Sequence, residues 1–314
     1  MSATETARTA RTVRGSGSAL RAARPRDRRH APAGGVRSRP GAEPELRVLG
    51  PLEVVAGGRS APLGSRRVRT VLGFLLLHAN EDVSPASLTG ALWPAEEPAT
   101  AGRMVHGAVS ALRDALPSGR GLAVSAPSPG AGDGDGGYRL TVPYDRVDLL
   151  RFRREAARGR RELAHGEWAS AATTLRRALG LWRGDVLADL GAECAWWPEP
   201  EAVREERWAA LYGRVTADLA LGRNHEVVRE LTVAAEEQPR RARLTGPLML
   251  ALYRVGRHVD ATRVYRRSRD ALVRSGGGEP CPELRGLQRA VLRHDPALLG
   301  PYLPFHRPVE PARP

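Results

Sequence analysis

The stretch PATAGRMVHGAVSALRDAL spans residues 98–116. On a helix with 3.6 residues per turn, its apolar side chains share one side and its polar side chains share the other. The apolar stripe consists of Ala101, Val105, Ala108, Val109, Leu112 and Leu116, and the polar side consists of Thr100, Arg103, His106, Ser110, Arg113 and Asp114. Any surface helix has an apolar stripe, but these polar side chains are of the types that bond phosphates and base edges. We therefore predict that this helix enters a DNA major groove.

The segments around this helix have the order of a winged helix-turn-helix domain. Strand residues in 46–55 are followed by a Gly57-Gly58 turn and a short strand at 61–63. Ser65 is predicted to cap a helix over 66–79, and Ser84-Pro85 to begin a second helix that continues to Trp93. After residue 116, strands at 122–124 and 138–142 flank a long Gly/Asp loop. In such folds the third helix lies in the major groove, and the hairpin is the wing.

The second half of the chain is predicted to be almost entirely helical from Val147 onward. Gly166, Gly222 and Gly256 each separate two helical patterns, and the last two lie 256 − 222 = 34 residues apart, the period of a tetratricopeptide hairpin. The step from Gly166 to Gly222 is 56 residues, so it contains an insertion, WRGDVLADLGAECAWWPEP. Further helices are predicted at 201–221, 225–237, 243–255, 259–274 and 283–294. Such hairpins stack into one helical layer. Trp182, Trp196 and Trp197 of the insertion indicate core packing, with an aromatic contact surface as the alternative.

The net charge of +14 is divided unevenly along the 314 residues. Residues 1–43 carry ten arginines against three acids, residues 44–142 nine against nine, and residues 143–314 thirty against twenty-three. The total favours a polyanionic partner. Because the segment that contains the proposed DNA-reading helix is neutral, its affinity for DNA must come from individually placed arginines.

The chain therefore divides into four predicted parts. Residues 1–43 form a disordered Arg-rich arm, either a solvated tail or a basic arm that adds salt-sensitive affinity for DNA. Residues 44–143 form the winged helix, and residues 144–299 form the tetratricopeptide-like all-α domain. Residues 300–314 are a flexible, Pro-rich tail. The fold class is mainly α, with an α+β domain first.

Several classes of function lack their sequence signatures. The eight histidines show no HExxH spacing, and neither cysteine has a CxxC partner, so no metal site is expected. There is no GxSxG elbow, and a Walker motif is impossible without lysine, so neither a catalytic site nor a cofactor is expected. The longest apolar run, 71–77, is too short to cross a bilayer. Two cysteines and no secretory apolar region favour the bacterial cytoplasm.

Longer stretches resemble the SARP family, the Streptomyces antibiotic regulatory proteins. LRVLGPLEVVAGGRSAPLGSRRVRTVLGFLLLHANEDVS, LTGALWPAEEPATAGRMVHGAVSALRDAL and GGYRL resemble its OmpR-type winged helix. LRRALGLWRGDVLADL, LALGRNHEVVREL, LMLALYRVGR and EPCPELRGLQRAVLRHDPAL resemble the bacterial transcriptional activator domain that follows it. The resemblance covers residues 45–299. It implies a transcription activator without catalysis that binds direct repeats in promoters of antibiotic gene clusters and recruits RNA polymerase. A homodimer on the DNA is a further hypothesis, and the sequence leaves the oligomeric state open. The alternative is a helical-repeat adaptor whose winged helix binds protein rather than DNA.

The predicted DNA contacts come from three places. On the third helix they are Arg103, His106, Ser110 and Arg113, with Thr100 either bonding a phosphate or capping the helix. At the start of the first helix Arg66, Arg67 and Arg69 meet either an outside anion or an internal acidic partner, since cations are disfavoured at a helix N-terminus. At the wing, Asp133 and Asp135 would repel phosphates, so Tyr138 and Arg139 at its base are predicted instead. Arg263, Arg266, Arg267 and Arg269 form either a solvated face or a contact with an acidic polymerase surface.

Overall fold

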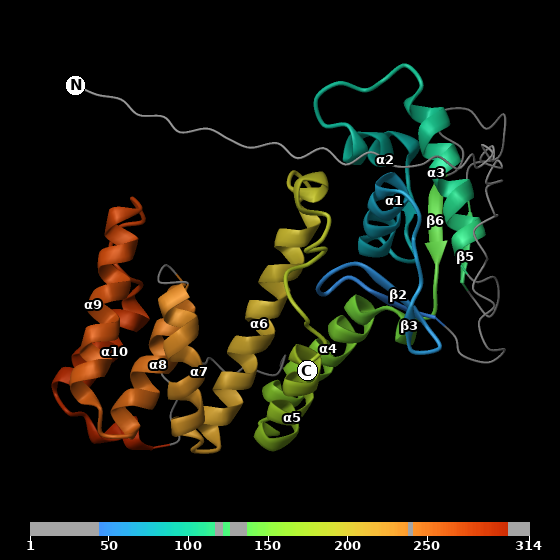
Figure 1. Ribbon diagram of the computed structural model, residues 1–314. Helices are drawn as coiled ribbons and strands as arrows, with labels where there is room; N and C mark the ends of the chain where they lie inside the picture. Colours follow the sequence, from blue (N-terminus) through green and yellow to red (C-terminus); the bar gives the residue numbers. More distant parts are fainter. Residues whose placement is uncertain (1–43, 117–121, 126–136, 238–240, 301–314) are drawn as a thin grey trace, which may run out of the picture. The chain divides into compact units, whose positions relative to one another are not determined.

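The computed structural model describes residues 44–116, 122–125, 137–237 and 241–300 (Figure 1). Within these ranges, strands occur only in the first part of the chain, and the rest is helical (Figure 1). The predicted fold class, an α+β winged helix followed by an all-α domain, is confirmed. No helix in the described ranges is both long and apolar enough to cross a membrane.

A three-stranded antiparallel sheet begins the described chain. Its strands are β1 (Glu45–Arg47), β2 (Glu53–Ala56) and β3 (Arg59–Ser60), in the order β1-β2-β3. Gly57 and Gly58 have φ angles of +60° and +77°, which suit the two-residue turn that joins a tight hairpin. Ala56 therefore pairs directly with Arg59. The sequence predicts the third strand at 61–63, and the structure places it two residues earlier, at Arg59–Ser60.

Three helices follow, and two begin at the caps that the sequence predicts. They are α1 (Arg66–Leu77), α2 (Pro85–Leu92) and α3 (Ala101–Ala115). The Ser65 hydroxyl accepts a hydrogen bond from the Val68 N–H at 3.4 Å, and the Ser84 hydroxyl accepts one from the Ser87 N–H at 3.0 Å. These bonds satisfy N–H groups that have no partner inside the helix.

The wing sheet has three strands rather than the predicted two. They are β4 (Asp82–Val83), β5 (Ala123–Ser125) and β6 (Tyr138–Thr141), in the order β4-β6-β5. The sequence does not predict β4, because two residues are too few to show an alternating pattern. Most of the wing loop, including Asp133 and Asp135, lies outside the described residues.

The second half consists of helical hairpins. Its elements are η1 (Tyr144–Arg146), α4 (Asp148–Ala164), α5 (Trp168–Leu179), η2 (Gly191–Cys194), α6 (Glu199–Ala220), α7 (Asn224–Glu237), α8 (Ala242–Arg254), α9 (His258–Arg274), α10 (Pro282–Leu292) and η3 (Pro296–Leu299). Gly166, Gly222 and Gly256 have φ angles of +75°, +74° and +79° between successive helices. This left-handed conformation strongly favours glycine, and the three predicted hairpin turns are confirmed.

The hydrophobic core does not separate at residue 143, where the sequence divides. One cluster of buried side chains runs from Leu46 to Ala210, and a second runs from Val215 to Leu298. The change from one core to the next therefore falls within α6. The winged helix shares its core with α4, α5, the insertion 182–200 and the first half of α6.

The insertion joins the two halves. Trp197 is 5% exposed, lies edge-on to Phe74 of α1 with ring centroids 5.0 Å apart, and donates its indole N–H to the Ala91 carbonyl of α2 at 2.9 Å. Trp182 packs edge-on against Phe152 at 5.4 Å, whereas Trp196 is 41% exposed. Core packing is thus confirmed for two of the three tryptophans. The insertion packs against the winged helix, which its length alone did not predict.

Backbone hydrogen bonds complete this joint. The buried Asp148 carboxylate accepts the Val48 and Leu49 N–H groups at 2.9 and 3.0 Å. The Leu49 carbonyl in turn accepts the Arg183 N–H at 2.7 Å. Residues about a hundred positions apart are therefore bonded through main-chain groups, which the sequence pattern does not reveal.

Candidate nucleic-acid interface

Helix α3 buries its apolar stripe and presents its polar side to solvent. Its buried residues are Ala101, Val105, Ala108, Val109 and Leu112. Arg103 and His106 are exposed, and Ser110 is half-buried. Gly102 and Gly107 lie on the same exposed side, and a Cβ added at either would meet no atom within 4 Å. The exposed side is therefore open to a close approach along its first two turns.

Thr100 precedes α3 but does not cap it. No side chain makes a capping hydrogen bond at this end, and the Thr100 hydroxyl lies 3.4 Å from the Met104 sulfur. The capping alternative is wrong, and the phosphate contact remains a prediction. The uncapped N–H groups of a helix N-terminus are suited to an anion.

Arg113 and Arg139 both make internal contacts. The Arg113 Nε donates to the Val124 carbonyl of β5 at 2.8 Å, which ties the last turn of α3 to the wing sheet. Arg139 pairs with Asp82 of β4 at 2.9 Å, and its side chain is 40% exposed. These bonds hold both guanidinium groups against the wing sheet and use part of their hydrogen-bonding capacity.

Tyr138 does not reach the surface that the sequence analysis assigned to it. Along β6 the side chains of Tyr138 and Leu140 point inward, and those of Arg139 and Thr141 point outward. Tyr138 is 5% exposed, and burial raises the pKa of its phenol, although the nearby Arg113 acts in the opposite direction. The two-residue period of a strand separates Tyr138 from Arg139, so the two could not face the same surface.

The three arginines at the start of α1 differ in whether they have a partner inside the protein. Arg66 pairs with Glu193, and Arg69 pairs with Asp189 and donates to the Leu52 carbonyl at 3.1 Å. For these two, the internal-partner alternative is confirmed. Arg67 is exposed and has no hydrogen bond or ion pair with any described residue. Arg67 is therefore the member of this group that no described carboxylate engages, while Arg66 is paired but remains 70% exposed.

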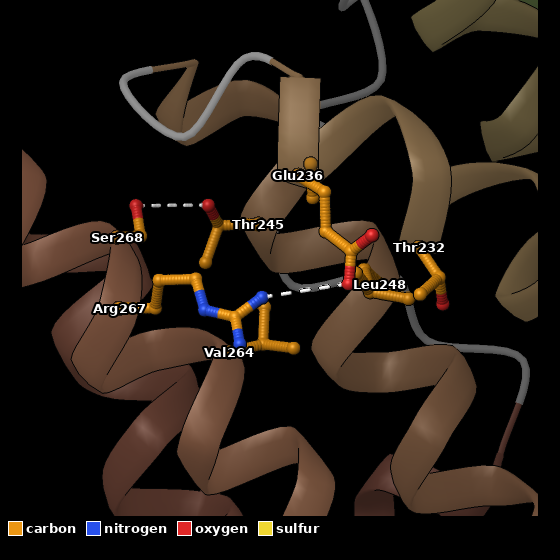
Figure 2. Close-up of a pocket in the computed structure, with 8 residues that line it drawn as sticks. Thr232, Glu236, Thr245, Leu248, Val264, Arg267 and Ser268 are labelled. Atoms are coloured by element: carbon orange, nitrogen blue, oxygen red, sulfur yellow. Dashed lines mark hydrogen bonds and ion pairs between the residues drawn. The ribbon is translucent and has the colours of Figure 1, made fainter. Parts of the chain in front are cut away.

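The arginines of α9 are largely paired with neighbouring acids. Arg263 contacts Asp260 at 3.1 Å, Arg269 pairs with Glu279, and Arg267 lies 3.6 Å from Glu236 of α7. Figure 2 shows this last pair and the buried Thr245–Ser268 hydrogen bond of 3.0 Å among the residues that line a small hollow between α7, α8 and α9. The hollow has a volume of about 40 Å³, which admits a water molecule but no organic ligand. These contacts favour a solvated, fold-stabilising face.

No group of three metal-binding side chains lies together in the part of the chain that the structure describes. Acidic side chains such as Asp114 of α3 are exposed on the winged helix, and so are cationic and hydrogen-bonding side chains, among them Arg67 of α1 and Arg103 and His106 of α3. Such groups can bind a nucleic-acid backbone and base edges without catalysis.

Comparisons with known proteins place this chain among bacterial regulators. Residues 147–292 match the family model described as "Bacterial transcriptional activator domain". The chain is 32% identical over 263 residues to the regulatory protein DnrI of Streptomyces peucetius, covering 83% of this chain and 97% of DnrI. It is 35% identical over 254 residues to the regulatory protein AfsR of Streptomyces coelicolor, covering 80% of this chain and 24% of AfsR.

A solved relative has the same fold. The structure of Mycobacterium tuberculosis EmbR in complex with a low-affinity phosphopeptide superposes with a TM-score of 0.73 and 33% identity, covering 81% of this chain and 66% of that one. The Mycobacterium tuberculosis transcriptional regulatory protein EmbR is 35% identical over 252 residues, and this chain spans 63% of its length. The predicted resemblance is confirmed: the chain belongs to the SARP family of transcriptional regulators, which are not enzymes.

Proposed function

We propose that this regulator is a sequence-specific DNA-binding activator whose helix α3 reads the major groove. The observation that carries the proposal is the division of α3 into a buried apolar stripe and an exposed side with Arg103 and His106. Arginine pairs bidentately with guanine in the major groove, and a neighbouring side chain without bulk allows the helix to approach. Gly102 and Gly107 meet that second requirement.

The remaining contacts position the helix rather than read bases. The further proposed contacts are Arg67 of α1, Thr100 before α3, Ser110 and Arg113 of α3, and Arg139 of β6. Arg66 and Arg69 are committed to Glu193 and Asp189, and the buried Tyr138 is excluded from the proposed contacts. Arg67 and Arg103 make no side-chain bond to a described residue, whereas Arg113 and Arg139 keep only part of their hydrogen-bonding capacity. These four arginines supply the affinity of an otherwise neutral region, and that affinity falls as salt rises.

The relatives also suggest which genes this regulator controls. DnrI and AfsR come from Streptomyces and are named regulatory proteins, which supports a promoter target in a secondary-metabolite cluster. We propose that the chain binds direct repeats there as a homodimer and that its helical half contacts RNA polymerase. It works in the bacterial cytoplasm, where the promoter is.

Fluorescence anisotropy with a labelled duplex from the upstream region of its own gene tests the α3 assignment. Arg103→Ala and His106→Ala remove exposed groups of α3, and Arg229→Ala on α7 is a matched exposed control. Arg103→Ala is expected to weaken specific binding by about 1–3 kcal/mol, and Arg67→Ala to lower the salt slope by about 1 for any sequence. Equal affinities for Arg103→Ala and Arg229→Ala would remove α3 from the groove.

The alternative, an adaptor whose winged helix binds protein, predicts that duplex affinity is weak and independent of Arg103. Substitutions separate the two functions better than a deletion of residues 143–314. Because the core of the winged helix continues to Ala210, that deletion would remove part of its core.

A further inference from the structure

A cavity of about 360 Å³ lies where the first strand meets the helical half. Its charged lining consists of Arg47 on β1, Arg146 on η1, Asp148 and Arg151 on α4, Arg183 after α5, and Glu45 on β1. Four guanidinium groups thus face two carboxylates around one space. Ligand pockets in proteins start at about 300 Å³, so the cavity has room for a small ligand.

The two carboxylates are already engaged. Glu45 accepts the Arg47 guanidinium at 2.7 Å, and Asp148 accepts two backbone N–H groups while lying 3.6 Å from Arg183. Burial raises the pKa of Asp148, although its hydrogen bonds and Arg183 act in the opposite direction. Behind the lining, Glu53 is shared by Arg183 at 2.9 Å and Arg47 at 3.7 Å. Asp145 likewise lies 3.7 Å from Arg146. The carboxylates therefore hold three of the four arginines in the walls and leave the Arg151 side chain toward the cavity.

Arg151 is the least compensated group. It is half-buried, and its side chain makes no hydrogen bond or ion pair with any described residue. It contributes only a longer-range attraction to Glu45. It also stands in the first turn of α4, where the helix dipole disfavours a cation and favours an anion. A partly buried guanidinium without a partner is costly, and a bound anion would remove that cost.

We propose that this cavity binds a small polyphosphate, with Arg151 and the neighbouring arginines holding its phosphate oxygens. Guanidinium groups bond phosphate oxygens in pairs, and four of them around one space can reach the several oxygens of a pyrophosphate group. The ligand contacts β1 of the winged helix and α4 of the helical half at once. Its binding therefore stabilises the joint between the DNA-reading half and the half that activates.

Calorimetric titration of the full chain with inorganic pyrophosphate, at constant ionic strength, tests the proposal. One pyrophosphate per chain is expected. Arg151→Gln is expected to weaken binding about 10-fold or more, since it removes charge-assisted hydrogen bonds. Arg154→Gln, on the exposed side of the same helix, makes the same change of charge and is expected to leave affinity unchanged. Arg151→Lys keeps the positive charge but loses the paired N–H donors of the guanidinium, so its affinity for pyrophosphate should lie between those of Arg151→Gln and Arg154→Gln.

Three results would overturn the proposal. Equal affinities for Arg151→Gln and Arg154→Gln would mean that pyrophosphate binds surface arginines in general. Citrate binding as tightly as pyrophosphate, with the same dependence on Arg151, would make the site one for carboxylates. Displacement of pyrophosphate by duplex DNA, together with weaker DNA binding by Arg151→Gln, would assign the cavity to the DNA interface. A urea midpoint of Arg151→Gln equal to that of the parent, without ligand, shows that the variant is folded.

Discussion

Trp197→Ala tests whether the insertion is part of the core that supports the DNA-reading half. Trp197 belongs to the second half by sequence, yet its ring packs on Phe74 and its indole N–H satisfies the Ala91 carbonyl at the end of α2. Replacement of a buried tryptophan by alanine costs about 3–5 kcal/mol. Since domains are stable by only about 5–15 kcal/mol, the variant should lose a large part of its stability.

The adjacent Trp196 is a control of the same residue type. Its side chain is 41% exposed, so Trp196→Ala is expected to cost at most about 1 kcal/mol. Trp197→Phe keeps much of the ring but leaves the Ala91 carbonyl without its donor, a loss of about 1–3 kcal/mol. The expected order of stability is therefore the parent and Trp196→Ala first, then Trp197→Phe, and Trp197→Ala last.

Urea unfolding followed by far-ultraviolet circular dichroism measures these differences, with the slope of free energy against urea compared among variants. Promoter affinity should fall for Trp197→Ala under conditions where part of the population is unfolded, and should recover at lower temperature or with osmolyte. If Trp197→Ala and Trp196→Ala had equal unfolding free energies, the contact between the insertion and the α1–α2 pair could not be part of the core.

Three further predictions concern particular contacts. The Asp218 carboxylate is 1% exposed and forms ion pairs with Arg176, Arg214 and Arg223 at 3.2, 3.2 and 2.9 Å. Asp218→Ala leaves the buried Arg214 without one carboxylate, so it should lower the free energy of unfolding in urea by about 3–5 kcal/mol; a decrease below about 1 kcal/mol would contradict this. Gly50 has φ +150°, and an added Cβ would lie 2.9 Å from Arg183 Cβ, so Gly50→Ala should lower the melting temperature, whereas Gly90→Ala on the open side of α2 should raise it slightly; the reverse order would refute the close approach. Burial raises the pKa of Asp148 in the folded protein, so the folded state keeps the Asp148 proton to a higher pH than the unfolded state does. The unfolding free energy of the parent minus that of Asp148→Asn should therefore fall as pH rises from the unfolded pKa through the folded pKa. Denaturation curves across this acid range measure the difference, and a difference that rises with pH would show that the hydrogen bonds to Asp148 outweigh its burial.

Local patterns predicted the elements of the fold well. The caps at Ser65 and Ser84 and the turns at Gly166, Gly222 and Gly256 depend on side-chain bonding and backbone sterics within a few residues. The amphipathic side of α3 depends only on the helical period. These are short-range properties, so one sequence is enough to read them. The errors at β3 and β4 arose where the strands are too short to carry a pattern.

The candidate site was predicted less completely, because partners far apart in the chain decide which charges are free. Arg66, Arg67 and Arg69 look alike in the sequence, yet Glu193 and Asp189 engage two of them and leave Arg67 without a carboxylate among the described residues. Tyr138 was assigned to the surface because its position at the wing base was considered without its direction. The strand alternation already contained that direction and could have corrected the assignment.

The sequence by itself determined the two-part order of elements, the reading side of α3 and membership of the SARP family. Only the tertiary structure decided where the core divides and which arginines remain uncommitted. The physical reason is that helix and turn preferences act between neighbours, whereas burial and ion pairing depend on groups brought together from distant segments. The joint between Asp148, Arg183, Trp197 and the winged helix consists of such contacts, so it becomes visible only when the chain is folded.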